Sequence, residues 1–156
     1  MRRAWYRLVG WVGTVITTRW LHAPLYRWTG GWGPLGRSLG ILTVVLVTAG
    51  ARTGRRRETA MWAHPDGADL VLVASNGGRG RIPGWCWNLR AGPEAEVLVH
   101  REWRAVRARE AVAAEYDRLW ALVTAAYPGY LDYQVRWGER RIPLVVLVPA
   151  TPPARG

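Results

Sequence analysis

The chain has 156 residues, of which 49% are apolar, so it has the size and the core material of one globular domain and not of two domains or of a disordered chain. Its 22 basic residues outnumber 11 acidic residues, which gives a formal net charge of +11. The single cysteine, Cys86, excludes an internal disulfide and is typical of a reducing compartment. The three histidines, His22, His64 and His100, lack the spacing of metal ligands, and we expect no metal site.

Residues 1–40 are expected to form a basic, tryptophan-rich amphipathic helix that ends in a linker. Ten arginines and no carboxylate lie between Met1 and Arg57, so most of the net charge belongs to the first third of the chain. The apolar run Leu8–Thr18 is shorter than the roughly 20 residues that cross a bilayer. Tryptophan and arginine together settle at lipid headgroups, although a helix packed on the domain with solvated arginines is the alternative. The pattern favours a cytoplasmic protein that contacts the anionic inner face of the plasma membrane.

From Ile41 onward the pattern changes to short strands. Ile41–Thr48 is a continuous apolar, largely β-branched run, typical of a strand buried on both faces. The other expected strands are Glu58–His64, Asp69–Ser75, Ala95–His100, Trp103–Glu110 and Pro143–Val148, and the expected helices are Trp85–Ala91, Ala113–Tyr127 and Tyr130–Trp137. Six strands, mostly linked as hairpins, predict a mainly β (α+β) domain over residues 41–149, an antiparallel barrel with small covering helices. A disordered tail is expected at residues 150–156.

Three segments carry candidate chemistry. The first, Thr48–Arg57, leads from a buried strand into a glycine-flanked turn with four arginines. Exposed backbone N–H groups, a threonine hydroxyl and guanidinium groups suit a phosphate or carboxylate, whereas a solvated basic hairpin is the alternative.

The other two segments are aromatic or rich in glycine. Val73–Gly78 ends in two glycines that let a ligand approach the backbone, and it leads to Pro83–Leu89, where tryptophan and asparagine can flank a planar ring. An ordinary loop with core tryptophans is the alternative there. Tyr127–Tyr133 contains three phenols spaced by three residues, which suits one wall of a pocket or a packed core.

In this order and spacing, the three segments make the chain resemble the deazaflavin-dependent nitroreductase family, small split β-barrel proteins that bind coenzyme F420. The family motif Thr-Thr-Gly-Arg-Lys-Ser/Thr-Gly, with an arginine three residues later, appears as Thr48–Arg57. The motif Ala-Ser-Asn/Lys-Gly-Gly, followed by Pro-x-Trp-Tyr-x-Asn-Leu, appears as Ala74–Gly78 and Pro83–Leu89. The motif Tyr-Pro-x-Tyr-x-x-Tyr appears as Tyr127–Tyr133, and the ending Arg-x-Ile-Pro-x-Val-Val appears as Arg140–Val146.

The resemblance implies an F420H2-dependent oxidoreductase that passes a hydride to quinone-like, nitroaromatic or enone acceptors near the membrane. The catalytic residues that it implies are Tyr127, Tyr130 and Tyr133. The residues that it implies for the coenzyme are Ala51, Arg52, Thr53 and Arg57 at the phosphate and tail, and Val73, Ala74, Ser75, Asn76, Gly84, Trp85, Cys86, Trp87, Asn88 and Tyr130 at the ring. Ala51 stands where the family usually has arginine, and it therefore contributes only backbone.

Two other classes of function stay open. Split barrels also carry FMN, haem or fatty acids, or lack catalysis; FMN is less expected than F420, because the arginine-rich turn suits the more anionic ligand. The basic first third alternatively serves a membrane- or nucleic-acid-binding module. No nucleic-acid motif is present and the tryptophans are not arranged as stacking platforms, so we expect no nucleic-acid partner. The sequence carries no signal for the oligomeric state.

Overall fold

The computed structural model describes residues 41–150. The expected amphipathic helix at residues 1–40 and residues 151–156 of the expected tail lie outside the described residues. The described part contains the strands β1 (Leu42–Ala49), β2 (Arg56–Asp66), β3 (Asp69–Val73), β4 (Glu94–Val99), β5 (Glu102–Glu110) and β6 (Leu144–Pro149), and the helices η1 (Asn76–Gly78, a 3-10 turn), α4 (Gly84–Ala91), α5 (Ala113–Ala126) and α6 (Gly129–Trp137).

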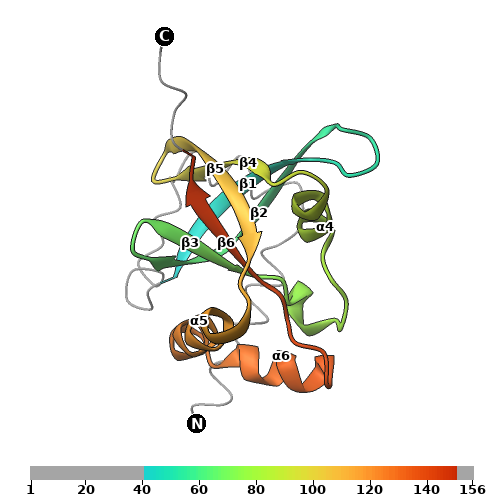
Figure 1. Cartoon of the computed structure of the whole chain (residues 1–156), viewed down its shortest axis with the longest axis vertical. Helices are drawn as coiled ribbons and strands as arrows, with labels where there is room; N and C mark the ends of the chain where they lie inside the picture. Colours follow the sequence, from blue (N-terminus) through green and yellow to red (C-terminus); the bar gives the residue numbers. More distant parts are fainter. Residues whose placement is uncertain (1–40, 151–156) are drawn as a thin grey trace.

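The six strands form one closed antiparallel barrel (Figure 1). Their order around the barrel is β1-β2-β3-β6-β5-β4, and β4 pairs back with β1 to close it. Strands β1, β2 and β3 follow one another as hairpins, as do β4 and β5, whereas β6 inserts between β3 and β5. The predicted barrel of six antiparallel strands with covering helices is confirmed.

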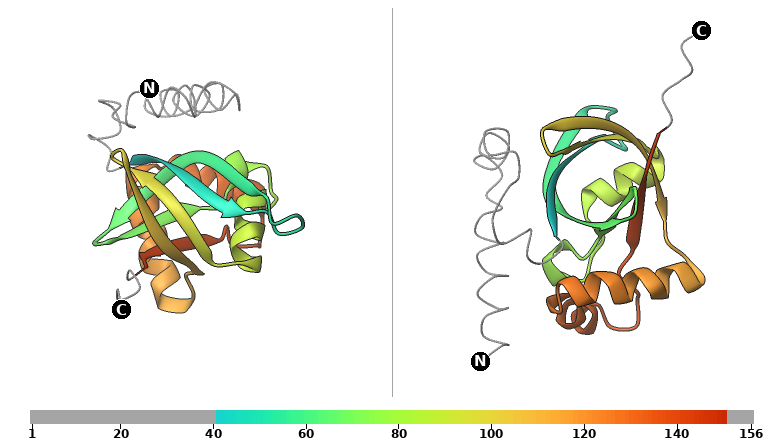
Figure 2. Two further views of the ribbon diagram at one scale, coloured as in Figure 1. Left: turned by 90° about the horizontal axis from the view of Figure 1, so that it is seen from above. Right: turned by 90° about the vertical axis from the view of Figure 1, so that its left-hand side faces the viewer.

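One core fills the inside of the barrel. Successive strand residues point to opposite faces, so each strand contributes every second side chain to this core. Its buried members are Val44, Leu46, Ala63, Leu72, Ala74, Cys86, Leu89, Val97, Val99, Val106, Ala108, Val145 and Leu147. Two of these, Cys86 and Leu89, come from α4, which therefore closes one end of the barrel. In the right-hand view of Figure 2, α4 lies across the barrel opening.

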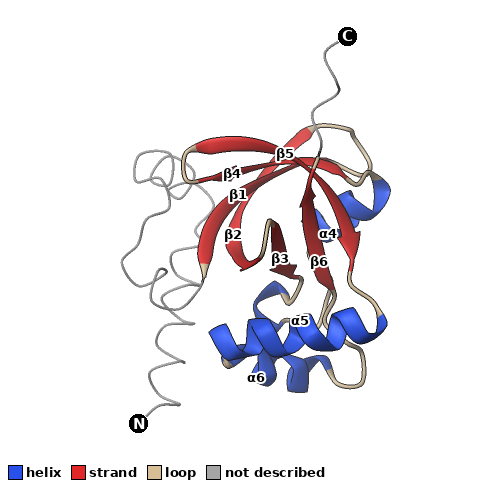
Figure 3. Ribbon diagram, turned by 60° about the vertical axis from the view of Figure 1, so that its left-hand side comes forward, coloured by secondary structure: helices blue, strands red, loops and turns tan. Residues whose placement is uncertain are grey.

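A second core lies outside the barrel, between β3, β6 and the helices α5 and α6. Val71 of β3 and Val146 of β6 point outward and pack against Leu119 and Val123 of α5. Strand β6 is therefore buried on both faces, as its uninterrupted apolar sequence predicts. Figure 3 shows α5 and α6 together at the end of the barrel where β3 and β6 meet them.

Several element boundaries differ from the expectation by one or two residues. Strand β2 begins at Arg56 and not at Glu58, because backbone pairing with Thr48 and Ala49 continues beyond the apolar residues. Strand β6 runs through Pro149, and the N–H of Ala150, the first residue of the expected tail, donates to the Ala105 carbonyl at 2.9 Å.

Candidate active site

The arginine turn, residues 50–57, connects β1 to β2 and presents its arginines to solvent. Thr48 and Ala49 pair with Arg57 and Arg56, so the loop itself comprises residues 50–55. The side chains of Arg52, Arg55 and Arg57 are all exposed. The turn therefore displays several guanidinium groups within one short hairpin, an arrangement that favours phosphate or carboxylate oxygens.

The backbone of this turn is less available than the sequence suggests. Gly50 donates its N–H to the Arg55 carbonyl, and Thr53 and Gly54 donate theirs to the Gly50 carbonyl. The Arg55 N–H donates to the Thr53 hydroxyl oxygen at 3.3 Å. The expectation of several exposed N–H groups is therefore wrong, because the tight hairpin uses them internally. An anion here meets mainly guanidinium groups and the hydroxyl proton of Thr53.

Asn88 of α4 fixes the turn to the end of the barrel. Its Oδ1 accepts the Ala51 N–H at 2.9 Å, and its Nδ2 donates to the Thr48 hydroxyl at 3.0 Å. The two bonds join the first and second sequence segments, which lie 37 residues apart at this contact. Asn88 thus sets the position of the arginine turn relative to α4.

The remaining α4 residues divide between the core and the surface. Cys86 is fully buried in the barrel core, and burial raises the pKa of its thiol to about 11. Its side chain faces the core, so only its backbone is open to the role predicted for it at a ring. Trp87 is 52% exposed, and the Arg90 guanidinium lies over its ring. Trp85 packs partly against the core, and a Cβ at Gly84 would meet no atom within 4 Å.

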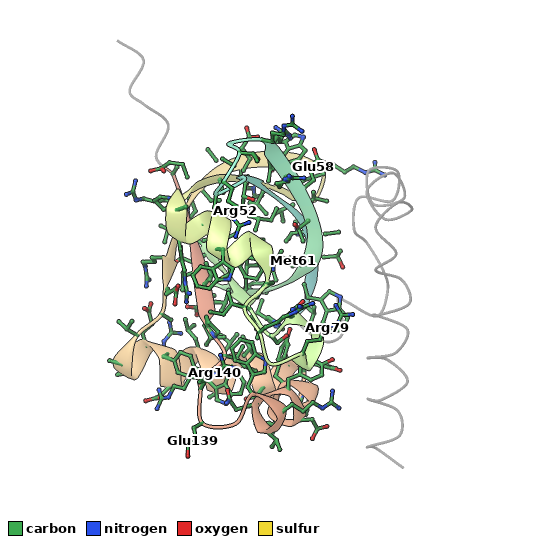
Figure 4. The ribbon with its side chains drawn as sticks, turned by 90° about the vertical axis from the view of Figure 1, so that its right-hand side faces the viewer. Arg52, Glu58, Met61, Arg79, Glu139 and Arg140 are labelled. Atoms are coloured by element: carbon green, nitrogen blue, oxygen red, sulfur yellow. The ribbon has the colours of Figure 1, made fainter. Side chains whose placement is uncertain are left out.

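The described arginines divide into those with an acidic partner and those without one. Among the described residues, ion pairs engage Arg56, Arg90, Arg104, Arg107, Arg109, Arg118 and Arg141. No described carboxylate pairs with Arg52, Arg55 or Arg57 of the turn, nor with Arg79 or Arg140. Figure 4 shows Arg52 beside α4 and Arg79 and Arg140 nearer α6, with Met61 of β2 between them. This side of the barrel thus has an excess of uncompensated positive charge.

A hollow of about 350 Å³ lies beside the turn, between the end of β1 and the start of β4. It is lined by Val47, Thr48, Ala49, Gly54, Arg56, Glu94, Ala95 and Glu96. Arg56 bonds to Glu96 and Glu58 there, so its charge is compensated. The carboxylates disfavour an anionic ligand in this hollow, which leaves the α4 side of the turn for one.

The double-glycine segment contacts α6. Gly78 lies so close to Tyr133 that an added Cβ would come within 2.6 Å of its ring, and the Trp137 indole N–H donates to the Ser75 carbonyl at 3.2 Å. Ala74 and Ser75 are buried, Val73 and Asn76 are partly exposed, and the loop then continues to α4. The second and third segments are therefore in direct contact, and α4 connects both to the arginine turn.

The three phenols form one aromatic cluster. The ring centroids of Tyr127 and Tyr130 are 5.0 Å apart, those of Tyr130 and Tyr133 are 6.0 Å apart, and Trp62 of β2 packs edge-on to Tyr127 at 5.4 Å. Tyr127 and Tyr130 are buried, whereas Tyr133 is partly exposed. Burial raises the pKa of both buried phenols, so they remain protonated at neutral pH. A protonated phenol can donate a hydrogen bond.

His64 joins this cluster from β2. Its Nε2 lies 3.1 Å from the Tyr130 hydroxyl, and its side chain is 0% exposed. Burial lowers its pKa to about 4, so the imidazole is neutral at pH 7. The three histidines are far apart in the sequence, so the sequence gave no reason to place His64 at the active site. Trp62 and His64 are two residues apart on one strand and so share a face, which is the signal that was available.

The comparisons with known proteins agree with this geometry. The family model described as F420H(2)-dependent quinone reductase matches residues 19–149. The chain belongs to the F420H2-dependent quinone reductase family. An F420H2-dependent quinone reductase of Mycobacterium tuberculosis is 36% identical over 132 residues, which are 81% of this chain and 87% of that protein.

Solved structures show the same fold. An F420H2-dependent reductase has a TM-score of 0.63 and 30% identity, over 69% of this chain and 93% of that one. A haem storage protein of Vibrio cholerae has a TM-score of 0.53 at 11% identity, over 76% of this chain and 90% of that one, and it shares the fold alone. The resemblance to F420-binding split barrels is confirmed.

Membership in the family makes this chain an F420-dependent oxidoreductase. The described residues fit the coenzyme, since Arg52, Arg79 and Arg140, which have no described acidic partner, lie on one side of the barrel with the partly buried, apolar Met61 between them. Residues 41–150 contain no group of side chains suited to a metal ion. No helix within this range is long and apolar enough to cross a bilayer.

Proposed function

We propose that the chain reduces quinones at a membrane surface, using F420H2 bound along the side of the barrel that carries the arginine turn, α4 and the three phenols. We propose nitroaromatic compounds and enones, which are also flat hydride acceptors, as further substrates. The observation that carries it is the grouping of arginines without acidic partners beside α4. Electrostatic attraction draws a long anionic coenzyme to that side.

In this proposal the anionic part of the coenzyme lies on the arginine turn. Arg52 and Arg57 bind its phosphate and acidic tail, and the Thr53 hydroxyl donates a hydrogen bond. Ala51 supports them through the Asn88 contact and does not bind the ligand itself, because Asn88 occupies its N–H. The ring then lies against residues 73–76 and 84–88, with Tyr130 at its far end.

Bound F420H2 supplies the hydride. The chain's own residues hold the acceptor and stabilise the negative charge that develops on its oxygen. Tyr133, which is partly exposed, and Tyr130 behind it are the donors of the hydrogen bond or proton. Trp62 and Tyr127 supply apolar walls that exclude water.

A kinetic comparison tests the phenols. We expect the change Tyr130→Phe together with Tyr133→Phe to slow oxidation of F420H2 by menadione by about 100-fold, as is typical when a positioned acid is lost. Tyr116→Phe is the matched control, since this buried phenol donates to the Ile142 carbonyl outside the cluster. Equal rates in the double variant and the control would remove the phenols from the mechanism. A nitroaromatic acceptor, assayed in parallel, decides whether that class belongs to the activity.

The membrane part of the proposal rests on the sequence of residues 1–40. We place the protein in the cytoplasm, at the inner face of the plasma membrane, where lipid-dissolved quinones are available. The full chain should sediment with vesicles that contain phosphatidylglycerol and not with pure phosphatidylcholine vesicles. Changing Arg2, Arg3 and Arg7 to glutamine should abolish this binding. The same change at Arg101, Arg104 and Arg107, which removes equal charge from the barrel, should leave it intact. Binding that responds equally to both sets would contradict a specific N-terminal contact.

A further inference from the structure

The His64–Tyr130 pair has a feature that the fold does not require. His64 is fully buried, yet its Nδ1 has no hydrogen-bond partner in the described structure. A buried polar atom without a partner is unfavourable, and an aliphatic side chain would pack on the outer face of β2 without that cost. Within residues 41–150, the polar contact of the ring is the Tyr130 hydroxyl, at 3.1 Å from Nε2.

Two neutral tautomers of His64 are conceivable, and they have opposite consequences for Tyr130. With the proton on Nδ1, an N–H donor would be buried without an acceptor, and Nε2 would accept a hydrogen bond from the Tyr130 hydroxyl. With the proton on Nε2, the unpartnered atom is only an acceptor, which is the more tolerated case, and Nε2–H donates to the Tyr130 oxygen. The burial of Nδ1 therefore favours the Nε2–H tautomer.

We propose that His64 is a positioning residue for Tyr130: its Nε2–H donates to the phenol oxygen, which leaves the hydroxyl proton free for the acceptor oxygen. This inference rests on the proposed function, in which Tyr130 serves the reaction. The rings support it, since His64 and Tyr130 meet edge-on with centroids 5.6 Å apart, and Tyr127 also meets Tyr130 edge-on, at 5.0 Å. The phenol thus has a fixed ring and one fixed hydrogen-bond donor.

The bond also matters for proton transfer. Reduction of a quinone to a hydroquinone takes up one hydride, supplied by F420H2, and one proton. When Tyr130 releases its proton to the acceptor oxygen, the O–H bond of the phenol breaks and a new one forms on the product. The Nε2–H group of His64 then stabilises the phenolate that remains, until the phenolate takes a proton from water. His64 itself neither gains nor loses a proton.

NMR spectroscopy tests the geometry without the coenzyme. The ¹⁵N shifts of the His64 ring in the full chain report which nitrogen carries the proton. We expect the Nε2–H tautomer at pH 7, and we expect Tyr130→Phe to shift the Nε2 resonance. A proton on Nδ1, or a ring unaffected by Tyr130→Phe, would overturn the proposal. Since this readout needs no activity, it decides the pair even if the chain fails to oxidise F420H2, a result that would contradict the proposed function instead.

A double-mutant cycle tests the consequence for the reaction. His64→Leu should lower kcat for menadione by about 10-fold with little change in KM, as is typical when an oriented proton donor is disturbed. His64→Gln should recover most of kcat, because the glutamine Nε2 amide can donate to the same oxygen. In a Tyr130→Phe background, His64→Leu should have no further effect. An equal loss in that background, or an unchanged kcat in His64→Leu, would overturn the proposal. His100→Gln, an exposed position, is the control.

Discussion

His64 couples stability to pH through its burial. Its pKa is lowered from 6.5 to about 4 in the folded chain, whereas an unfolded chain protonates it near 6.5. Between these values the unfolded state binds the proton and the folded state does not, so stability falls as the pH falls through this window. The difference predicts a loss of roughly 2 to 3 kcal/mol between pH 7.5 and pH 4.5.

Urea unfolding of the wild type and of His64→Leu at pH 7.5 and pH 4.5 measures this loss. Hydrogen bonds from arginine lower the pKa values of the Asp66 and Glu115 carboxyl groups, which moves their titration away from this window. The variant should therefore lack most of the drop. If both proteins lost the same free energy of unfolding, His64 would not be the group responsible.

At the scale of single residues, the sequence identified candidate site residues but not the groups to which they hydrogen-bond. The arginines of the turn and the phenols were identifiable from spacing. The bonds of Asn88 to Ala51 and of His64 to Tyr130 span 37 and 66 residues, and only the closed barrel brings these groups together. The internal use of the turn's N–H groups was equally invisible, because it depends on the hairpin geometry.

Among the contacts between elements, the contact of η1 with α6 is the most sensitive to a small substitution. Gly77 and Gly78 both have positive φ values, 64° and 75°, so alanine is strained at either position by roughly 1 kcal/mol. A Cβ at Gly77 meets no atom within 4 Å, whereas at Gly78 it would lie 2.6 Å from the Tyr133 ring. The two substitutions therefore differ in one respect, the displacement of Tyr133.

We expect Gly77→Ala to lose stability with menadione turnover nearly unchanged. Gly78→Ala should lose stability further and reduce turnover by about 10-fold or more, because a misplaced donor loses its alignment with the acceptor. Thermal melts and steady-state kinetics on both variants measure this. Matching turnover in the two variants would show that the position of Tyr133 does not matter to the reaction.

The elements themselves were largely predictable. The β-branched runs identified β1 and β6 to within one residue at each end, because burial on both faces leaves a continuous apolar sequence. Strand β2 was predicted too short, because its first residues are charged and pair only through the backbone. The order of the strands, with β6 between β3 and β5, required the structure.

Over the whole described domain, the arginines differ in whether a carboxylate pairs with them. Arginines on β5 and α5 are compensated by neighbouring carboxylates, and such exposed pairs contribute little to stability. Arg52, Arg55 and Arg57 of the turn have no described acidic partner, which leaves a positive field on the side of α4. This contrast between compensated and uncompensated arginines makes the two groups natural test and control positions.

The most direct test of the account is the affinity for F420, measured by fluorescence quenching for the wild type, Arg52→Gln, Arg57→Gln and the control Arg104→Gln. All three variants lose one exposed positive charge, and only the control loses an arginine that has a carboxylate partner. We predict that the two turn variants bind at least about 10-fold more weakly, as expected for a lost charge-assisted hydrogen bond, and that the control binds like the wild type. Equal affinity in all four proteins would contradict a coenzyme site at the arginine turn.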